Sequence, residues 1–196
     1  MVRKKFTLKQ RRLLAVLLSR ANVAFSSLQY ELTHGINALG WLYVISPKAQ
    51  ASQTYTVLLH DCERFFQNRR VIFDSHTSVY KSYKQAHARN SAEIARKLME
   101  AENFSKSDIE ATTFLIKDHE RGSTVLSYQV MAADSLSFFD TNIVGYYYGK
   151  GADETKKKIR FMWNRLKPPE RQLVIKGQFL FKKIPEIFNL FREVAF

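Results

Sequence analysis

Hydrophobic residues recur three and four positions apart along most of this 196-residue chain, a spacing that places them on one face of an α-helix. In the first such stretch, residues 7–31, the recurring residues are Leu13, Leu14, Val16, Leu17, Ala21, Ala24, Phe25 and Leu28. The chain has seven Gly and four Pro, which are too few for the many turns of an all-β protein. We therefore predict an all-α fold.

Residues that favour helix ends divide this pattern. Thr33 is suited to cap the start of a second helix, and Pro47 ends it. Gly149-Lys150-Gly151 and Pro168-Pro169 mark later breaks, with Pro169 suited to a first helical turn. The predicted helices span residues 7–31, 33–45, 51–67, 79–102, 107–119, 124–147, 153–166 and 169–193. Residues 68–78 are expected to form a loop with local strand character.

The size and composition of the chain fit one globular domain, with 45% hydrophobic and 25% charged residues and no evident linker or repeat. A single cysteine, Cys62, excludes an intramolecular disulfide and favours a reducing compartment, so we expect a cytoplasmic protein. No apolar run is long enough to span a membrane. Arg11-Arg12 interrupts the apolar stretch that a secretion signal would need.

The formal net charge of +13 is concentrated at the two ends of the chain. The basic residues there are Arg3, Lys4, Lys5, Lys9, Arg11, Arg12 and Arg20 at the start, and Lys156, Lys157, Lys158, Arg160, Arg165, Lys167, Arg171, Lys176, Lys182 and Lys183 at the end. Such ends favour anionic partners, and nucleic acid is one candidate. A solubilising surface is the alternative, because no zinc-finger or RNA-recognition signature accompanies the charge.

A set of histidines and aspartates lies between these basic ends. His60 and Asp61 end the apolar run 55–59, and His87, His119 and Asp134 follow on later predicted helices. His34 precedes them near the start of the second predicted helix. Their helical neighbours at three, four and seven residues are largely apolar, which predicts that the set faces inward. Mixed nitrogen and oxygen ligands of this kind suit one or two divalent metal ions.

Each of these residues also has a structural reading. A single inward-facing histidine is commonly a hydrogen-bonded core residue, and an inward aspartate can be paired with a cation instead of a metal. Cys62 is interpreted as a small buried hydrophobic residue. His76, beside Asp74, is interpreted as a surface or substrate-facing residue and not as a ligand.

The order of these motifs resembles the HD-domain superfamily of metal-dependent phosphohydrolases. The resemblance covers residues about 30–145 and rests on Leu58-Leu59-His60-Asp61, on His87 with Ala92-Glu93-Ile94-Ala95, on Ile116-Lys117-Asp118-His119-Glu120 and on Ala133-Asp134-Ser135-Leu136. By position, His34 would be the family's first histidine, His60-Asp61 its His-Asp pair and Asp134 its last aspartate. His87 and His119 would be the additional histidines of members with two metals.

Two departures indicate a divergent branch. Glu63 and Arg64 occupy positions where many members have Gly-Lys, so Arg64 would replace the lysine. The Gly-Tyr-Pro motif of the branch that cleaves cyclic dinucleotides is missing, and the interval from His119 to Asp134 is shorter than in that branch.

The resemblance implies a single-domain helical bundle of HD-domain type over residues 1–196, with a metal-site core at about 30–145 and basic helical extensions packed on it. It implies a phosphohydrolase that uses one or two ions of Mn, Mg, Ni, Co, Zn or Fe on a nucleotide or another phosphorylated small molecule. Asp61 would bridge two metals, and Glu120 would orient His119 or carry a proton. The cations nearest in sequence to the ligands, and therefore the candidates for substrate binding, are Arg64, Lys84, Arg89 and Arg121.

Two other functions remain open at this stage. One is a non-catalytic protein that binds nucleic acid or an acidic partner through its basic ends, with a structural His/Asp set. The other is a di-iron oxygenase, a minority activity in the superfamily. Two aromatic groups, 146–148 and 161–163, either line a base-stacking pocket or pack in a core. The sequence does not indicate an oligomeric state.

Overall fold

The computed structural model describes residues 6–72 and 80–196, and none of these residues lies in a β-strand. The α-helices are α1 (Leu8–Arg20), α2 (Phe25–Ile45), α3 (Ala51–Leu59), α4 (Tyr80–Ala101), α5 (Lys106–Asp118), α6 (Val125–Ser137), α7 (Ile143–Asn164), α8 (Pro168–Lys176) and α9 (Pro185–Ala195). Short 3₁₀ turns η1 (Cys62–Phe65), η2 (Gln67–Arg69) and η4 (Leu180–Lys183), and the π-helical turn η3 (Phe138–Asn142), connect them. The all-α prediction is confirmed.

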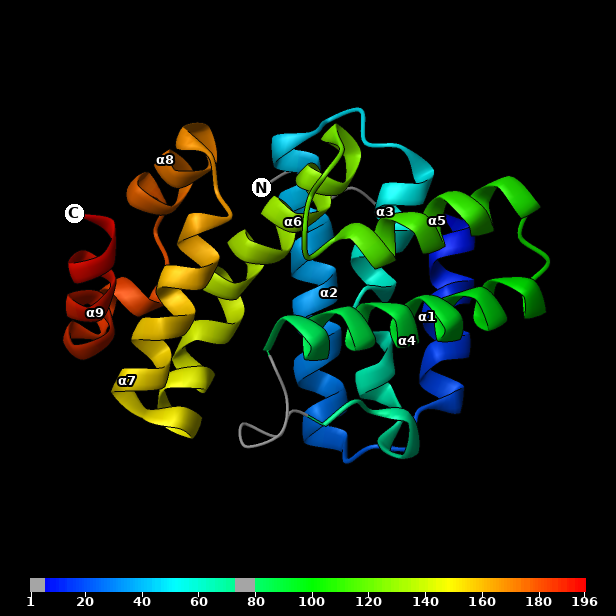
Figure 1. Cartoon of the computed structure of the whole chain (residues 1–196), viewed down its shortest axis with the longest axis horizontal. Coiled ribbons are helices and arrows are strands. Elements are labelled where there is room, and N and C mark those ends of the chain that lie inside the picture. The colour runs from blue at the N-terminus through cyan, green and yellow to red at the C-terminus, as the bar shows by residue number, and fades with distance from the viewer. Residues whose placement is uncertain (1–5, 73–79) are drawn as a thin grey trace.

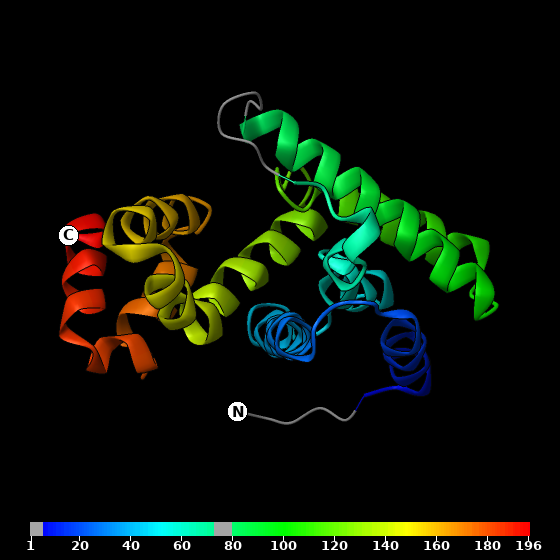
Figure 2. The same ribbon diagram turned by 90° about the horizontal axis from the view of Figure 1, so that it is seen from below.

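Helices α1 to α5 form one side of the molecule, α7 to α9 form the other, and α6 runs between them (Figures 1 and 2). Helix α2 packs against both α3 and α6, α4 packs against α5, and α7 packs against α9. Because α2 and α6 lie against each other, residues near the middle of each can reach the same point.

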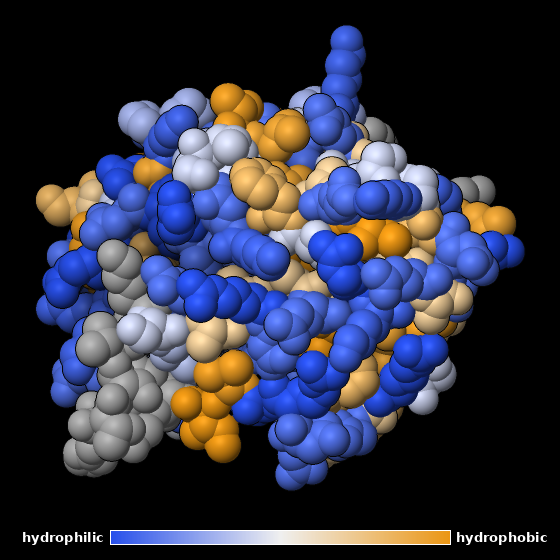
Figure 3. All heavy atoms as spheres, turned by 45° about the vertical axis from the view of Figure 1, so that its right-hand side comes forward, coloured by the Kyte–Doolittle hydropathy of each residue, from blue (hydrophilic) through white to orange (hydrophobic). Residues whose placement is uncertain are grey.

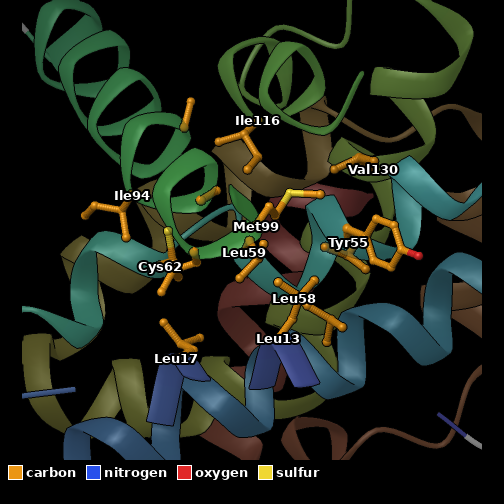
Figure 4. Packing of buried hydrophobic residues seen from close by; sticks show 14 of the residues in the cluster. Leu13, Leu17, Tyr55, Leu58, Leu59, Cys62, Ile94, Met99, Ile116 and Val130 are labelled. Atoms are coloured by element: carbon orange, nitrogen blue, oxygen red, sulfur yellow. The ribbon is translucent and has the colours of Figure 1, made fainter. Parts of the chain in front are cut away.

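The buried hydrophobic residues form two clusters. The first holds Leu13 and Leu17 of α1 with Leu59, Cys62 and Met99, and Figure 4 shows these side chains pointing toward one another. The second is rich in aromatic residues, which are Phe138, Phe139, Trp163, Phe179, Phe181 and Phe191. Trp41 and Ile45 of α2 pack against both clusters and so join them. Cys62 is fully buried, as predicted.

Several predicted helix boundaries are wrong at the N-terminal end. The predicted helix 7–31 is two helices, because the chain turns at Ala21 and the backbone N–H of Asn22 donates to the carbonyl of Phe65. Thr33 does not begin a helix, since α2 runs through it. The predicted helix 51–67 ends at Leu59, and the 3₁₀ turns η1 and η2 follow it.

The C-terminal boundaries also differ from prediction. The predicted helix 124–147 is interrupted by η3, and α7 continues past the expected break with a kink at Gly151, whose φ of +81° suits glycine. The predicted helix 153–166 is therefore the second part of α7. The predicted helix 169–193 stops at Gly177, where a Cβ would lie 2.5 Å from a ring carbon of Phe179, and Pro185 begins α9.

Two further predictions concern the loop and the membrane. The described part of the loop 68–78 contains no strand, while Asp74 and His76 lie outside the described residues. No helix in residues 6–72 and 80–196 is long and apolar enough to cross a membrane. One face of the molecule is mainly hydrophilic, with hydrophobic residues in small separate patches (Figure 3).

Candidate metal centre

The structure brings all six predicted metal ligands together between α2, α4 and α6. Their potential ligand atoms form two groups, one of His34, His60 and Asp134 and the other of Asp61, His87 and His119. Within each group these atoms lie within 4.8 Å of one another. The rings of His60 and His119, one from each group, are 5.1 Å apart between centroids. The two groups therefore adjoin.

Local structure at the C-terminal ends of α3 and α5 orients two of the histidines, His60 and His119. His60 caps the C-terminus of α3, and its Nδ1 lies 3.1 Å from the carbonyl of Val57. His119 caps α5 in the same way, with Nδ1 2.6 Å from the carbonyl of Ile116. Because a carbonyl only accepts a hydrogen bond, Nδ1 carries the proton in both rings, and the Nε2 lone pair of the neutral ring points into the site.

These two Nε2 atoms are buried, and neither has a hydrogen-bond partner among the described residues. The His60 Nε2 lies 3.5 Å from Asp134 Oδ1 and 3.7 Å from Asp61 Oδ2, and the His119 Nε2 lies 3.3 Å from Glu120 Oε1. Leaving buried polar atoms without partners costs free energy. Two orphaned imidazole nitrogens that face carboxylate oxygens form a donor set that fits a divalent cation.

His34 and His87 are held by hydrogen bonds on both ring nitrogens. His34 Nε2 lies 3.0 Å from Asp134 Oδ1, and its Nδ1 lies 2.9 Å from the hydroxyl of Ser137. His87 Nε2 lies 2.7 Å from Asp61 Oδ1, and its Nδ1 lies 2.7 Å from Glu63 Oε1. An outer carboxylate on a ligating histidine fixes the ring and raises its basicity.

Asp61 lies between the two groups. One carboxylate oxygen faces His87, and the other lies 2.9 Å from Arg64 and 3.7 Å from His60. Burial would raise the pKa of Asp61, but Arg64 and the nearby histidines hold it well below its usual range. The carboxylate is therefore ionised at neutral pH and available to a cation.

Asp134 and Glu120 are also kept ionised. Burial would raise the pKa of Asp134, but Arg165 and the hydrogen bond from His34 hold it well below its usual range. Burial opposes ionisation of Glu120 as well, and His119 and Lys84 outweigh it. The Lys84 ammonium lies 2.5 Å from Glu120 Oε1.

The acidic neighbours also change the charge of His60. Burial would lower its pKa, but the carboxylates of Asp61 and Asp134 raise it to about 9. The carboxylates thus favour a positive charge at the centre of the site. A metal ion and a proton on this histidine would compete for the same nitrogen.

A cavity of about 110 Å³ lies beside this centre. Three of the predicted ligands line it, namely His34, Asp61 and Asp134. The remaining lining residues are Tyr30, Arg64, Lys84, Glu120, Phe138, Asn142, Tyr146, Lys158 and Met162. The π-helical turn η3 places Phe138 and Asn142 there, consistent with the frequent occurrence of such turns at functional sites.

Two of the four predicted substrate cations, Arg64 and Lys84, line this cavity, and the other two do not. Arg89 is exposed on α4. The side chain of Arg121 is 72% exposed and lies 3.6 Å from Asp118. Sequence proximity to a ligand histidine therefore did not place either side chain at the cavity.

Sequence reasoning missed three residues of the site. Glu63 is buried and supports His87, Arg165 pairs with Asp134, and Lys158 lines the cavity. Arg165 and Lys158 had been grouped with the basic C-terminal end. Arg165 lies three residues after Met162 and Lys158 four residues before it, which places all three on one helical face, and this was the available signal.

The aromatic groups have mixed positions. Tyr146 and Met162 line the cavity, and Met162 and Trp163 also belong to the second hydrophobic cluster. The packing interpretation is therefore correct for most of the group 161–163, and one tyrosine of the group 146–148 reaches the site.

A comparison with protein-family models finds a match to residues 19–184, described as a domain of unknown function (DUF4202). The chain belongs to this family. The DUF4202 match contains every residue of the candidate metal centre, from His34 to Arg165, and most of both hydrophobic clusters. No curated protein and no solved structure matches the chain.

Proposed function

We propose that this DUF4202 protein is a metal-dependent phosphohydrolase of the HD-domain type. The observation that carries the proposal is the pair of orphaned Nε2 atoms of His60 and His119 among ionised carboxylates. The order of the ligands along helices also supports it, because it follows the HD-domain pattern. The cations that line the adjoining cavity, Arg64, Lys84 and Lys158, also support the proposal.

One ion would be held by His34, His60 and Asp134, and a second by His87, His119 and Asp61. Asp61 contacts members of both groups, which supports its role as the bridging carboxylate. When bound, divalent ions supply a Lewis acid that activates water at neutral pH and offsets charge on phosphate oxygens. Mixed imidazole and carboxylate ligands accept Mn, Mg, Ni, Co, Zn or Fe, so the metal is left to experiment.

The residues around the ligands have distinct roles in this proposal. Glu63 and the hydroxyl of Ser137 hold the rings of His87 and His34 in place. Glu120 lies beside His119 with one carboxylate oxygen that has no hydrogen-bond partner among the described residues, and it would orient His119 or carry a proton. Arg64 would face the phosphate from the side of Asp61.

We also propose that the two hydrophobic clusters act as one domain. Residues of α7 complete a cavity that α2, α4 and α6 also line, and Trp41 packs against both clusters. On this proposal the basic C-terminal part contributes Lys158 and Met162 to the cavity.

Metal analysis of the purified protein, followed by a phosphoester panel with each metal supplied, tests the proposal. One or two equivalents of metal and metal-dependent phosphate release are expected. Two equivalents of redox-active iron without phosphate release would instead indicate an oxygenase. Absence of bound metal together with salt-sensitive nucleic-acid binding would indicate a binding protein.

A further inference from the structure

We propose that the cavity beside the metal centre binds the phosphoryl group of a compact phosphomonoester, and that Lys158 is the side chain that recognises it. This inference rests on the proposed function, because three of the proposed ligands, His34, Asp61 and Asp134, line the cavity. It adds a substrate class and a specificity residue from α7, outside the region of the HD-domain resemblance.

Three cations gather around the ring of Phe161, and two of them, Lys84 and Lys158, line the cavity. The ammonium nitrogens of Lys84 and Lys158 lie 5.7 and 5.2 Å from the ring centroid, and the guanidinium carbon of Arg165 lies 5.3 Å from it. Lys158 also lies 5.8 Å from the centroid of Phe138. The aromatic faces attract the cations and keep them close together despite their mutual repulsion.

These cations differ in their acidic partners. Lys84 pairs with Glu120, and Arg165 pairs with Asp134 at 2.9 Å. Arg64, which also lines the cavity, pairs with Asp61. Within the described residues no carboxylate forms an ion pair with Lys158, whose recorded contacts are the two aromatic rings. Its charge is therefore the one that an incoming anion would neutralise.

The surroundings make that neutralisation favourable. Burial, followed by repulsion from Lys84, lowers the pKa of Lys158 to about 7. A phosphoryl dianion beside the ammonium would offset both effects and hold the lysine in its charged form. Charge-assisted hydrogen bonds to phosphate are among the stronger polar contacts in proteins.

The size of the cavity limits the ligand. The cavity has a volume of about 110 Å³. Pockets for drug-sized ligands are several times larger, at roughly 300–1,000 Å³. A phosphoryl group with a short organic part therefore fills the cavity, whereas a nucleoside would extend beyond it.

The arrangement of the walls favours a terminal phosphate. The lining comes from α2, α4, α6, η3 and α7 and from the turns after α3 and α5, so the described residues surround the cavity on several sides. A phosphodiester continues on both sides of its phosphorus and needs a groove with two exits. A monoester needs one exit, with Tyr30, Phe138 and Tyr146 available to contact the carbon atoms beside the ester oxygen.

Binding of inorganic phosphate to the metal-loaded protein tests the role of Lys158. Lys158→Met keeps an unbranched apolar side chain against Phe138 and Phe161 but removes the charge. The matched control is Lys157→Met, because Lys157 is exposed on the same helix and pairs with Glu154. Calorimetry should show roughly 10- to 100-fold weaker phosphate binding for Lys158→Met, the scale of one charged hydrogen bond. Lys157→Met and Lys158→Arg should bind nearly as the parent does.

Hydrolysis kinetics test the substrate class. The parent should release phosphate from glycerol 3-phosphate with a higher kcat/KM than from adenosine monophosphate or bis(p-nitrophenyl) phosphate. Lys158→Met should raise the KM for glycerol 3-phosphate by a factor similar to its loss of phosphate affinity. Faster turnover of the nucleotide or the diester would overturn the compact-monoester assignment.

Metal content, measured for every variant, separates this inference from the proposed function. Equal phosphate affinity in the parent and Lys158→Met, with metal bound in both, would overturn the role of Lys158 and leave the proposed function standing. Lysine-dependent phosphate binding in a parent that holds no metal would overturn the proposed function and support the phosphate pocket. If Lys158→Met does not fold, the Lys158→Gln titration tests the role of the charge, and parent-like phosphate affinity in that variant would overturn it. The absence of a phosphate-dependent rise in the Tm of the parent would reject the pocket.

Discussion

Arg165 Nη1 lies 2.9 Å from Asp134 Oδ2, and this ion pair ties α7 to the candidate metal centre. Both side chains are less than one-tenth exposed. The same guanidinium donates to the carbonyl of His119 at 3.2 Å. Arg165 therefore occupies one oxygen of Asp134, while the other oxygen faces His34 and His60.

We expect Arg165→Met to destabilise the metal-free protein by roughly 3 kcal/mol, because removing one partner leaves a buried charge uncompensated. Added Mn²⁺ should restore part of the loss, since a cation at Asp134 replaces the missing charge. Urea unfolding with and without Mn²⁺ measures both effects. Arg160→Met, at an exposed position of α7, is the control and should change little. An unchanged free energy of unfolding in Arg165→Met would show that the Arg165–Asp134 ion pair does not stabilise the protein.

Asp61→Asn should abolish most of the activity. The substitution keeps the shape of the side chain but removes the negative charge that faces both ligand groups. We expect bound metal to fall and phosphoester hydrolysis to drop at least about 100-fold, the scale of losing a key electrostatic group.

Asp153→Asn, at an exposed carboxylate, serves as the control for Asp61→Asn. Circular dichroism should show the same helix content in the parent and both variants, because the hydrophobic clusters do not include Asp61. A folded Asp61→Asn protein that keeps its metal and its turnover would show that the site has been assigned wrongly.

The helical character and the inward-facing His/Asp set followed from local pattern. Apolar neighbours at three, four and seven residues place a side chain on the buried face of its own helix, and this holds for His34, His87 and Asp134. The pattern does not say which buried faces meet. The order of motifs in the HD-domain resemblance supplied that expectation.

The misplaced boundaries depend on contacts distant in sequence. The break after α1 is stabilised by Asn22, which donates to Phe65 and accepts from the backbone of Gln67. No glycine or proline marks the break. In contrast, Gly177 and Pro185 mark the end of α8 and the start of α9. Helical periodicity alone predicted one continuous helix across them.

The site residues that sequence reasoning missed also depend on contacts distant in sequence. Arg165 reaches Asp134 across 31 positions, and Lys158 shares its cavity with His34 across a much longer interval. Both appear in sequence as part of a basic helix, where a solvent-facing charge is the ordinary interpretation. Only the packing of α7 against η3 and its neighbours turns one face of that helix toward the ligands.

The basic ends should contribute unequally to any nucleic-acid binding. Lys156 and Lys157 form ion pairs with Glu193 and Glu154, whereas Arg11 and Arg12 are exposed on α1. Affinity falls as the salt concentration rises, so the slope of log affinity against log salt concentration is negative. Replacing both arginines with glutamine should make this slope less steep by about 2, the value for two lost phosphate contacts. Replacing both lysines should change it less. Fluorescence anisotropy with a labelled oligonucleotide over a salt series measures these slopes, and salt-independent binding by the parent would reject electrostatic association.

The hydroxyl of Tyr128 should make stability depend on alkaline pH. It donates to Glu170 at 2.7 Å and accepts from the backbone N–H of Lys167 at 3.0 Å, so it links α6 to the start of α8. Burial, together with the hydrogen bond to Glu170, raises the pKa of Tyr128 to about 12, compared with about 10 for an unfolded tyrosine.

Because the folded protein retains this proton longer than the unfolded chain does, its contribution is complete below pH 10 and is lost as the pH rises toward 12. Tyr128→Phe should therefore be less stable than the parent at pH 8, and the difference should shrink between pH 10 and 12. Urea unfolding across this range measures the difference, and Tyr148→Phe, at an exposed tyrosine of α7, is the control. A difference that stays constant to pH 12 would mean that the hydroxyl does not hold its proton through the contact with Glu170.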